Sequence, residues 1–128
     1  MNAHLTKLRE KVVKELKRRT KKSAKRYEAL CKIVPAGVMS RGRQIAPYPF
    51  FVAKAKGSRL WDIDGNEYVD AAVSYGAALL GHCHPVIVKA VQSTVKDLTN
   101  LAMPTEPSAR LAQLIHETAP CAEMVTLC

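Results

Sequence analysis

The sequence predicts an α+β chain: a basic N-terminal helix, a small antiparallel meander, two further helices and a final strand. Three patterns carry this prediction. Apolar residues recur at helical spacing near the N-terminus, alternation with a period of two follows over residues 50–71, and helical spacing returns over residues 85–118. The chain has 128 residues, 48% of them hydrophobic, which is typical of a folded domain with a modest core.

The first element is expected to be a helix over residues 3–33. Its apolar stripe is narrow and runs through Leu5, Leu8, Val12 and Leu16 at steps of three and four. The stripe fades in the basic run 17–22 and resumes at Tyr27. The breakers in the segment 34–37, a proline and a glycine, end the helix.

The positive charge of the chain belongs to this predicted helix. Residues 1–26 contain eleven Lys/Arg and two Glu, a net charge of +9, whereas residues 27–128 contain nine of each sign. A solvated basic helix is the favoured interpretation, and a nucleic-acid or membrane arm and docking on an acidic partner remain alternatives. No apolar run approaches the roughly 18 residues that a transmembrane helix needs, so we expect no membrane-spanning segment.

The meander is expected from three short segments of alternating residues. These strands are Phe50–Ala55, Arg59–Ile63 and Glu67–Ala71. Turn residues separate them at 56–58 and at 64–66, where Gly and Asn tolerate positive φ.

Two helices and a strand are predicted after the meander. The first helix runs from Pro85 to Leu98 with a buried face at Ile87, Val91, Val95 and Leu98, and the second runs over residues 107–118 with Thr105 or Glu106 as its cap. The apolar segment 123–128 is predicted to be a buried strand. Because a hairpin and two helices pair such a strand poorly, we expect the chain to be a fragment of a larger domain.

Several polar groups allow two interpretations each. His82, Cys83 and His84 could bind a metal or form a tight turn into a helix, and the turn is favoured. Asp62, Asp64, Glu67 and Asp70 could serve acid–base chemistry, but their place around a hairpin favours solvated turn residues. The loop arginines Arg41 and Arg43 could hold a carboxylate, although a solvated arginine is favoured by composition. The four cysteines have no CxxC spacing and no preceding signal peptide, which predicts reduced thiols and a cytoplasmic location.

Several motifs resemble those of class III pyridoxal-phosphate aminotransferases. Residues 57–70, GSRLWDIDGNEYVD, resemble the family hairpin, and residues 74–76 (SYG) and 80–85 (LGHCHP) resemble the two motifs that follow it. Residues 34–40, VPAGVMS, are similar to a motif of the glutamate-1-semialdehyde aminomutase branch, and residues 104–106 (PTE) and 123–125 (EMV) match later family motifs. These motifs stand in family order.

The resemblance implies a fragment of a fold-type I PLP-dependent transferase. It implies a small N-terminal domain with a basic helix at 1–33 and a loop and hairpin at 34–83, followed over 84–128 by the start of the large PLP-binding domain and its sheet. It places Arg43, Ser40, Ser74, Tyr75 and Gly76 on the substrate side, with Arg43 holding a substrate carboxylate. The complete enzyme would be a homodimer that moves an amino group on an amino acid or amine.

The resemblance also implies that this stretch of chain is not a catalyst by itself. The Schiff-base lysine, the ring-pairing aspartate and the phosphate-binding turn of the family lie beyond the matched motifs. Tyr75 stands where Trp is commoner, and Ala36 and Arg41 also depart from the aminomutase pattern. Aminotransferase and aminomutase activity therefore both fit, and the alternative is a stand-alone interaction module that binds a full-length relative or an acidic partner through its basic helix.

Overall fold

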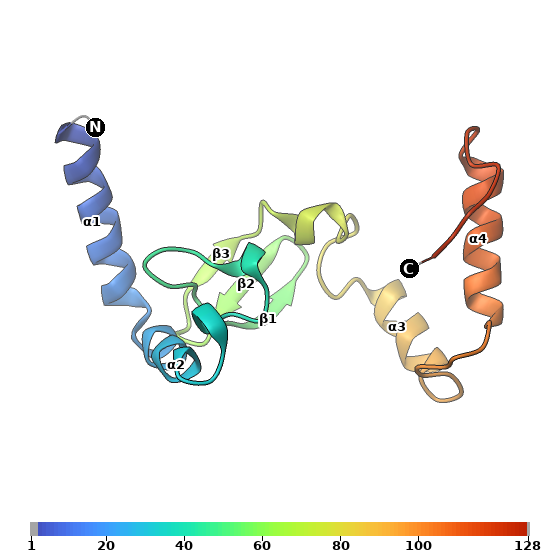
Figure 1. Cartoon of the computed structure of the whole chain (residues 1–128), viewed down its shortest axis with the longest axis horizontal. Helices are drawn as coiled ribbons and strands as arrows, with labels where there is room; N and C mark the ends of the chain where they lie inside the picture. The colour runs from blue at the N-terminus through green and yellow to red at the C-terminus, as the bar shows by residue number, and fades with distance from the viewer. Residues whose placement is uncertain (1–2, 128) are drawn as a thin grey trace. The chain divides into compact units, whose positions relative to one another are not determined.

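The computed structural model describes residues 3–127, which fall into two compact units, Met1–Pro85 and Val86–Cys128. The first unit contains helices α1 (Ala3–Arg19) and α2 (Lys21–Cys31) and a three-stranded sheet. The second contains most of α3 (Pro85–Thr94) and all of α4 (Glu106–Thr118). Figure 1 shows these elements in chain order.

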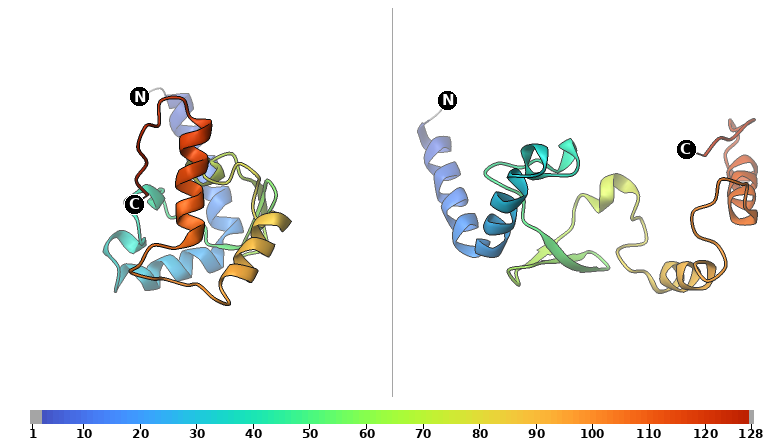
Figure 2. Two further views of the ribbon diagram at one scale, coloured as in Figure 1. Left: turned by 90° about the vertical axis from the view of Figure 1, so that its right-hand side faces the viewer. Right: turned by 60° about the horizontal axis from the view of Figure 1, so that its bottom comes forward.

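The prediction of one helix over residues 3–33 is wrong, because the helix breaks at Thr20. This residue has φ −122° and ψ 48° and is fully buried. Its hydroxyl donates to the Leu16 carbonyl at 2.7 Å and lies 3.2 Å from the Tyr48 hydroxyl. Figures 1 and 2 show the resulting change of direction between α1 and α2. The break therefore follows from a contact with a residue 28 positions away.

Asp64, in the turn after the second strand, caps the N-terminus of α2. The first N–H groups of a helix lack intrahelical acceptors, and the Thr20 side chain does not supply one here. Instead the Asp64 carboxylate accepts the Lys22 N–H at 2.6 Å, the Ser23 N–H at 3.0 Å and the Ser23 hydroxyl at 2.7 Å. A carboxylate at this end also complements the helix dipole. The turn thereby holds α2 against the sheet.

The antiparallel meander is confirmed, with strands β1 (Val52–Lys56), β2 (Arg59–Asp62) and β3 (Glu67–Val69) in that order. One face packs apolar and aromatic groups, and there the rings of Phe50 and Tyr68 stack at 4.4 Å. The opposite face carries Lys54 over the ring of Trp61 at 4.7 Å. The turn glycines occur at positive φ as expected, with Gly57 at 56° and Gly65 at 91°.

The carboxylate of Asp62 organises the turn between β2 and β3. The expectation of solvated turn acids is wrong here, since Asp62 is only 3% exposed. It accepts the N–H groups of Asp64 and Asn66, the Asn66 side-chain amide and the Tyr68 hydroxyl, all within 2.7–2.9 Å. Burial raises the pKa of Asp62, but these hydrogen bonds outweigh it and the pKa lies below its ordinary value. Burial and the hydrogen bond to Asp62 raise the pKa of Tyr68 to about 12.

The second unit exposes the apolar faces that were expected to be buried. Ile87 and Val91 in α3 and Val95 just after it are exposed, and in α4 so are Leu111 and Leu114. Both helices form, but α3 ends at Thr94 and not at the predicted Leu98. The predicted cap of α4 is confirmed because the Thr105 hydroxyl accepts the Ser108 N–H. The predicted strand over 123–128 is absent from the described residues 123–127, and residue 128 lies outside them. A strand needs a paired neighbour, and the described chain supplies none.

We expect Asp64→Ala to lower the unfolding free energy of the first unit by about 1–2 kcal/mol, because the Lys22 and Ser23 N–H groups lose their acceptor. Urea unfolding followed by the fluorescence of Trp61, the single tryptophan, measures this change. Asp97→Ala removes an exposed carboxylate after α3 and serves as the control. Equal stability of the two variants would contradict the capping role.

Candidate functional site

The structure brings the two predicted substrate-side segments together within the first unit. The short 3₁₀ turn Arg41–Arg43 and the 3₁₀ segment Val73–Gly76 are separated by about thirty residues. They meet where the Tyr75 hydroxyl donates to the Gly42 carbonyl at 2.9 Å. A Cβ added at Gly42 would lie 3.1 Å from the Tyr75 hydroxyl oxygen, so the glycine permits the close approach.

The segment that carries Ser74 and Tyr75 has an unusual backbone. Val73, Ser74, Tyr75 and Gly76 have φ values of 47°, 50°, 57° and 93°. Left-handed conformations are costly for residues other than glycine, above all for a β-branched residue such as Val73. Runs of this kind persist where the surrounding structure over-determines them, and they concentrate at functional sites. Tyr75 itself is 83% exposed, so burial of its ring does not hold it in place.

Asp70 is the residue that holds this segment. One carboxylate oxygen accepts the N–H groups of Ala72 and Val73 at 2.9 and 3.1 Å. The other oxygen lies 2.6 Å from His82 Nε2. The hydrogen bond with His82 lowers the pKa of the Asp70 carboxyl below its ordinary value, with smaller help from the two backbone amides. Asp70 therefore stays ionised and can serve both partners at once.

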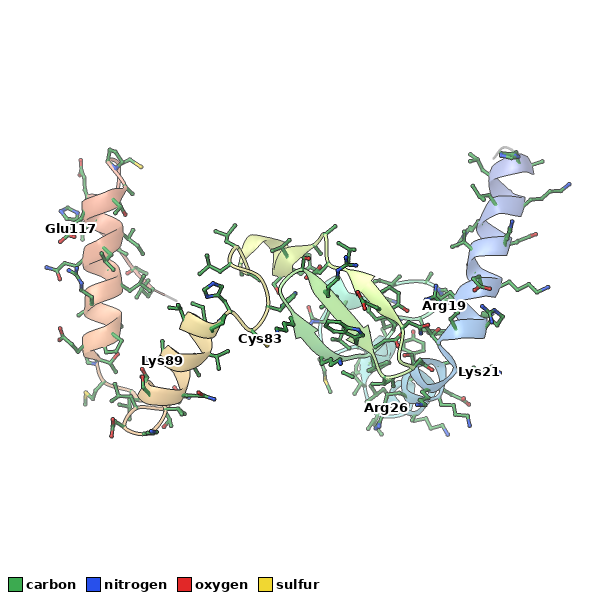
Figure 3. All side chains as sticks on the ribbon, turned by 180° about the vertical axis from the view of Figure 1, so that it is seen from behind. Arg19, Lys21, Arg26, Cys83, Lys89 and Glu117 are labelled. Carbon is green, nitrogen blue, oxygen red and sulfur yellow. The ribbon has the colours of Figure 1, made fainter. Side chains whose placement is uncertain are left out.

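His82 in turn fastens the segment to the meander. Its backbone exchanges two hydrogen bonds with Gly57, each 2.8 Å long. A Cβ at Gly81 would lie 3.0 Å from the Gly57 Cα, so a glycine is needed for this approach. Figure 3 shows Cys83 beyond the meander, on the side away from Arg19 at the end of α1 and from Lys21 and Arg26 in α2. Within residues 3–127 no three His, Cys, Asp or Glu side chains gather as a metal site would require.

Sequence reasoning named the residues of the meeting point but missed the pair that holds it. Arg43 and Ser40 lie in one exposed turn, joined by the Arg43 N–H and the Ser40 carbonyl at 2.9 Å. Ser74 is exposed too, and its carbonyl accepts the Ala77 N–H at 3.3 Å. The sequence predicts both Asp70 and His82 as turn residues. They lie 12 positions apart, and no pattern in the sequence indicates that they are in contact.

Arg43 lines a cavity whose other lining residues are apolar or glycine. Residues from the end of α2, from the 37–43 loop and from the start of β1 line it. Among the described residues no carboxylate pairs with the Arg43 guanidinium, so its donors remain available. An available guanidinium beside apolar walls can accept a carboxylate through two parallel hydrogen bonds.

Two features that bind pyridoxal phosphate in proteins are a lysine that forms the Schiff base and a helix N-terminus that holds the phosphate. Every lysine in residues 3–127 is exposed, whereas a Schiff-base lysine is activated by burial or by neighbouring charge. Two of the helix N-termini that could bind a phosphate are already occupied, α2 by Asp64 and α4 by the capping box of Thr105 and Ser108.

Comparison with known proteins identifies the family. The sequence model of the family described as Aminotransferase class-III matches residues 38–128. The chain belongs to this class III aminotransferase family. A glutamate-1-semialdehyde 2,1-aminomutase of Desulforamulus reducens is 40% identical over 109 residues, which covers 83% of this chain and 25% of that protein. The chain thus spans about a quarter of the length of that curated relative.

Solved structures of family members share the fold. A β-phenylalanine aminotransferase of Variovorax paradoxus superposes with a TM-score of 0.75 at 31% identity, over 81% of this chain and 24% of that one. A glutamate-1-semialdehyde aminomutase of Pseudomonas aeruginosa gives a TM-score of 0.80 at 25% identity, over 90% and 26%, and a variant of it was solved with PMP. The predicted fold class, a fragment of a PLP-dependent transferase of this type, is confirmed.

We expect Tyr75→Phe to loosen the Arg43 turn without unfolding the first unit. The variant loses one exposed hydrogen bond, worth about 1 kcal/mol or less, so the Trp61-monitored stability should change little. The ¹⁵N heteronuclear NOE of Gly42 and Arg43 should fall. Tyr27→Phe, which leaves the Gly42 contact intact, is the matched control. An unchanged NOE in Tyr75→Phe would show that the hydrogen bond does not order the turn.

Proposed function

We propose that this chain supplies the substrate-side part of a PLP-dependent class III aminotransferase or aminomutase. The reaction would move an amino group on an amino acid or amine substrate. The observation that supports the proposal is the 2.9 Å hydrogen bond from Tyr75 to Gly42, which places the turn of Arg43 beside the Ser74–Gly76 segment. Both segments lie within residues 38–128, which the model of the class III aminotransferase family matches.

In this proposal each group has a distinct task. Arg43 holds the substrate carboxylate through its two-pronged guanidinium. Tyr75 fixes the turn that carries Arg43, and the exposed hydroxyls of Ser40 and Ser74 offer hydrogen bonds to polar groups of the substrate. Asp70 is a positioning residue, since it acts through the backbone of the 72–73 peptide units.

The remaining features of the complete protein are part of the same proposal. The cofactor, pyridoxal phosphate, would be bound by groups outside the described residues, and this 128-residue polypeptide alone would be inactive. The complete enzyme would be a cytoplasmic homodimer in which residues 1–33 and 34–83 belong to a small flanking domain and 84–128 to the large one. Within residues 3–127 no helix has the length and hydropathy to cross a bilayer.

One observation favours a second candidate, a non-catalytic interaction module. Leu5, Leu8 and Val12 are exposed along one stripe of α1, and lysines and arginines surround them. Such a basic amphipathic helix suits an acidic partner with an apolar groove. Amino-group transfer by a chimera, in which this chain is joined to the rest of a family enzyme, separates the two candidates. An interaction module would not support this reaction.

The isolated 128-residue chain should form no specific adduct with pyridoxal phosphate. All of its described lysines are exposed, so borohydride reduction should trap low, scattered labelling across many lysines. Peptide mass spectrometry after reduction measures the distribution, and the Desulforamulus reducens enzyme serves as the positive control. One stoichiometric lysine adduct together with amino-group transfer would contradict the proposal.

Arg43→Ala should impair substrates that bear a carboxylate. The protein for this test is a chimera in which the chain replaces the segment that it matches in the Desulforamulus reducens enzyme. We expect kcat/KM for such substrates to fall about ten- to a hundredfold, the worth of a charge-assisted bidentate contact. Amines without a carboxylate should lose little. Arg59→Ala, which removes an arginine paired with Glu67 on the exposed sheet face, is the control.

No loss at all would show that Arg43 is a solvated loop residue, and equal losses for amines and amino acids would show that Arg43 does not act on the substrate carboxylate. A chimera that folds but transfers no amino group with any donor would instead favour the interaction module.

A further inference from the structure

The cavity beside Arg43 has an unusual composition for the site of a charged substrate. Its described lining comprises nine residues, of which Arg43 is the one with a charged side chain. The other lining residues are apolar or glycine. The larger apolar side chains among them are Leu30, Val38, Met39, Phe50 and Phe51. One cation at the edge of an apolar cavity defines a ligand with one anionic group and a hydrophobic body.

The walls of this cavity are built into the fold. The ring of Phe50 is stacked on Tyr68 at 4.4 Å, and the N–H of Phe51 donates to the buried Ser23 hydroxyl at 3.2 Å. Gly37, at φ 64°, lets the loop close over α2, because a Cβ there would lie 2.7 Å from both Cys31 Sγ and the Tyr27 ring. The cavity is therefore maintained by the same contacts that dock α2 on the sheet.

We infer that this cavity selects carboxylate substrates with a hydrophobic side chain, aryl or branched alkyl, over those with a polar one. Arg43 binds the carboxylate, and the apolar walls accept the side chain. The inference rests on the proposed role of Arg43 and adds the substrate class to it. A polar side chain would leave its hydrogen-bonding groups unpaired against Val38, Met39 and Phe51, which costs binding free energy.

The test is ligand binding to the 128-residue chain, followed by amide chemical shifts in NMR titrations. Three probes separate the contribution of Arg43 from that of the apolar walls. 3-Phenylpropionate carries a carboxylate and a ring, propionate lacks the ring, and 3-phenylpropan-1-ol lacks the negative charge. We expect 3-phenylpropionate to bind at least tenfold more tightly than either, with shifts at residues 37–39, 43 and 50–52.

Two pairs of variants control the assignment. Arg43→Gln should weaken 3-phenylpropionate about tenfold or more and leave 3-phenylpropan-1-ol unchanged, while Arg9→Gln on α1 changes neither. Met39→Gln should weaken 3-phenylpropionate about fourfold, the factor for roughly one buried methylene, and leave propionate unchanged. Met103→Gln is its matched control, since Met39 and Met103 are both 75% exposed and neither substitution disturbs a core.

The outcomes separate this inference from the proposed function. Equal binding of propionate and 3-phenylpropionate, both dependent on Arg43, would overturn the hydrophobic selection and leave the carboxylate role intact. Binding that does not depend on Arg43 would overturn both. Shifts at the same residues that grow with protein concentration alone would show that a second copy fills the cavity, and would also overturn the inference.

Discussion

The fold of the first unit depends on the turn between β2 and β3. Two carboxylates in this turn connect α2 to the sheet, a role that hydrophobic packing has in most small domains. Among the described residues Tyr48 is the one buried hydrophobic side chain, whereas Thr20, Ser23 and Asp62 are buried polar residues. Asp62 shapes the turn, and Asp64 extends from it to the N-terminus of α2. Because buried polar groups are costly unless paired, this network is specific as well as stabilising.

From this turn, a continuous set of contacts leads to the candidate site. The Ser23 hydroxyl donates to the Asp64 carboxylate and accepts the Phe51 N–H. These two bonds position the residues that precede β1 and one wall of the cavity. The meander then holds His82 through Gly57. His82 and Asp70 maintain the left-handed segment that presents Tyr75 to the Arg43 turn. The exposed residues that we propose for the substrate side are thus ordered by Asp70 and His82, which contact the backbone and each other.

Sequence reasoning succeeded where a local pattern decides the structure. Helical spacing predicted α3 and α4, period-two alternation predicted the meander, and Thr105 was expected among the caps of α4. Sequence reasoning failed where a contact between residues distant in the sequence decides the structure. The break at Thr20 depends on Tyr48, and the burial of Asp62 depends on Asn66 and Tyr68 closing around it. The segment 123–127 has a strand-like composition, but composition alone does not supply a partner strand. At the candidate site, the motif resemblance named Arg43 and Tyr75, while no periodicity in the sequence indicates that Tyr75 reaches Gly42.

The central claim is that carboxylates within the first unit order the proposed substrate-side segments, in a chain that spans about a quarter of the length of a curated relative. Amide hydrogen exchange of the 128-residue chain near neutral pH tests it most directly. The N–H groups of Ser23, Asn66 and Val73 donate to carboxylates of Asp64, Asp62 and Asp70, so their protection reports on these contacts alone. The account predicts that all three amides exchange much more slowly than those of exposed turns. Exchange at the rate of an unstructured chain at these positions, with protection confined to helix interiors, would contradict it.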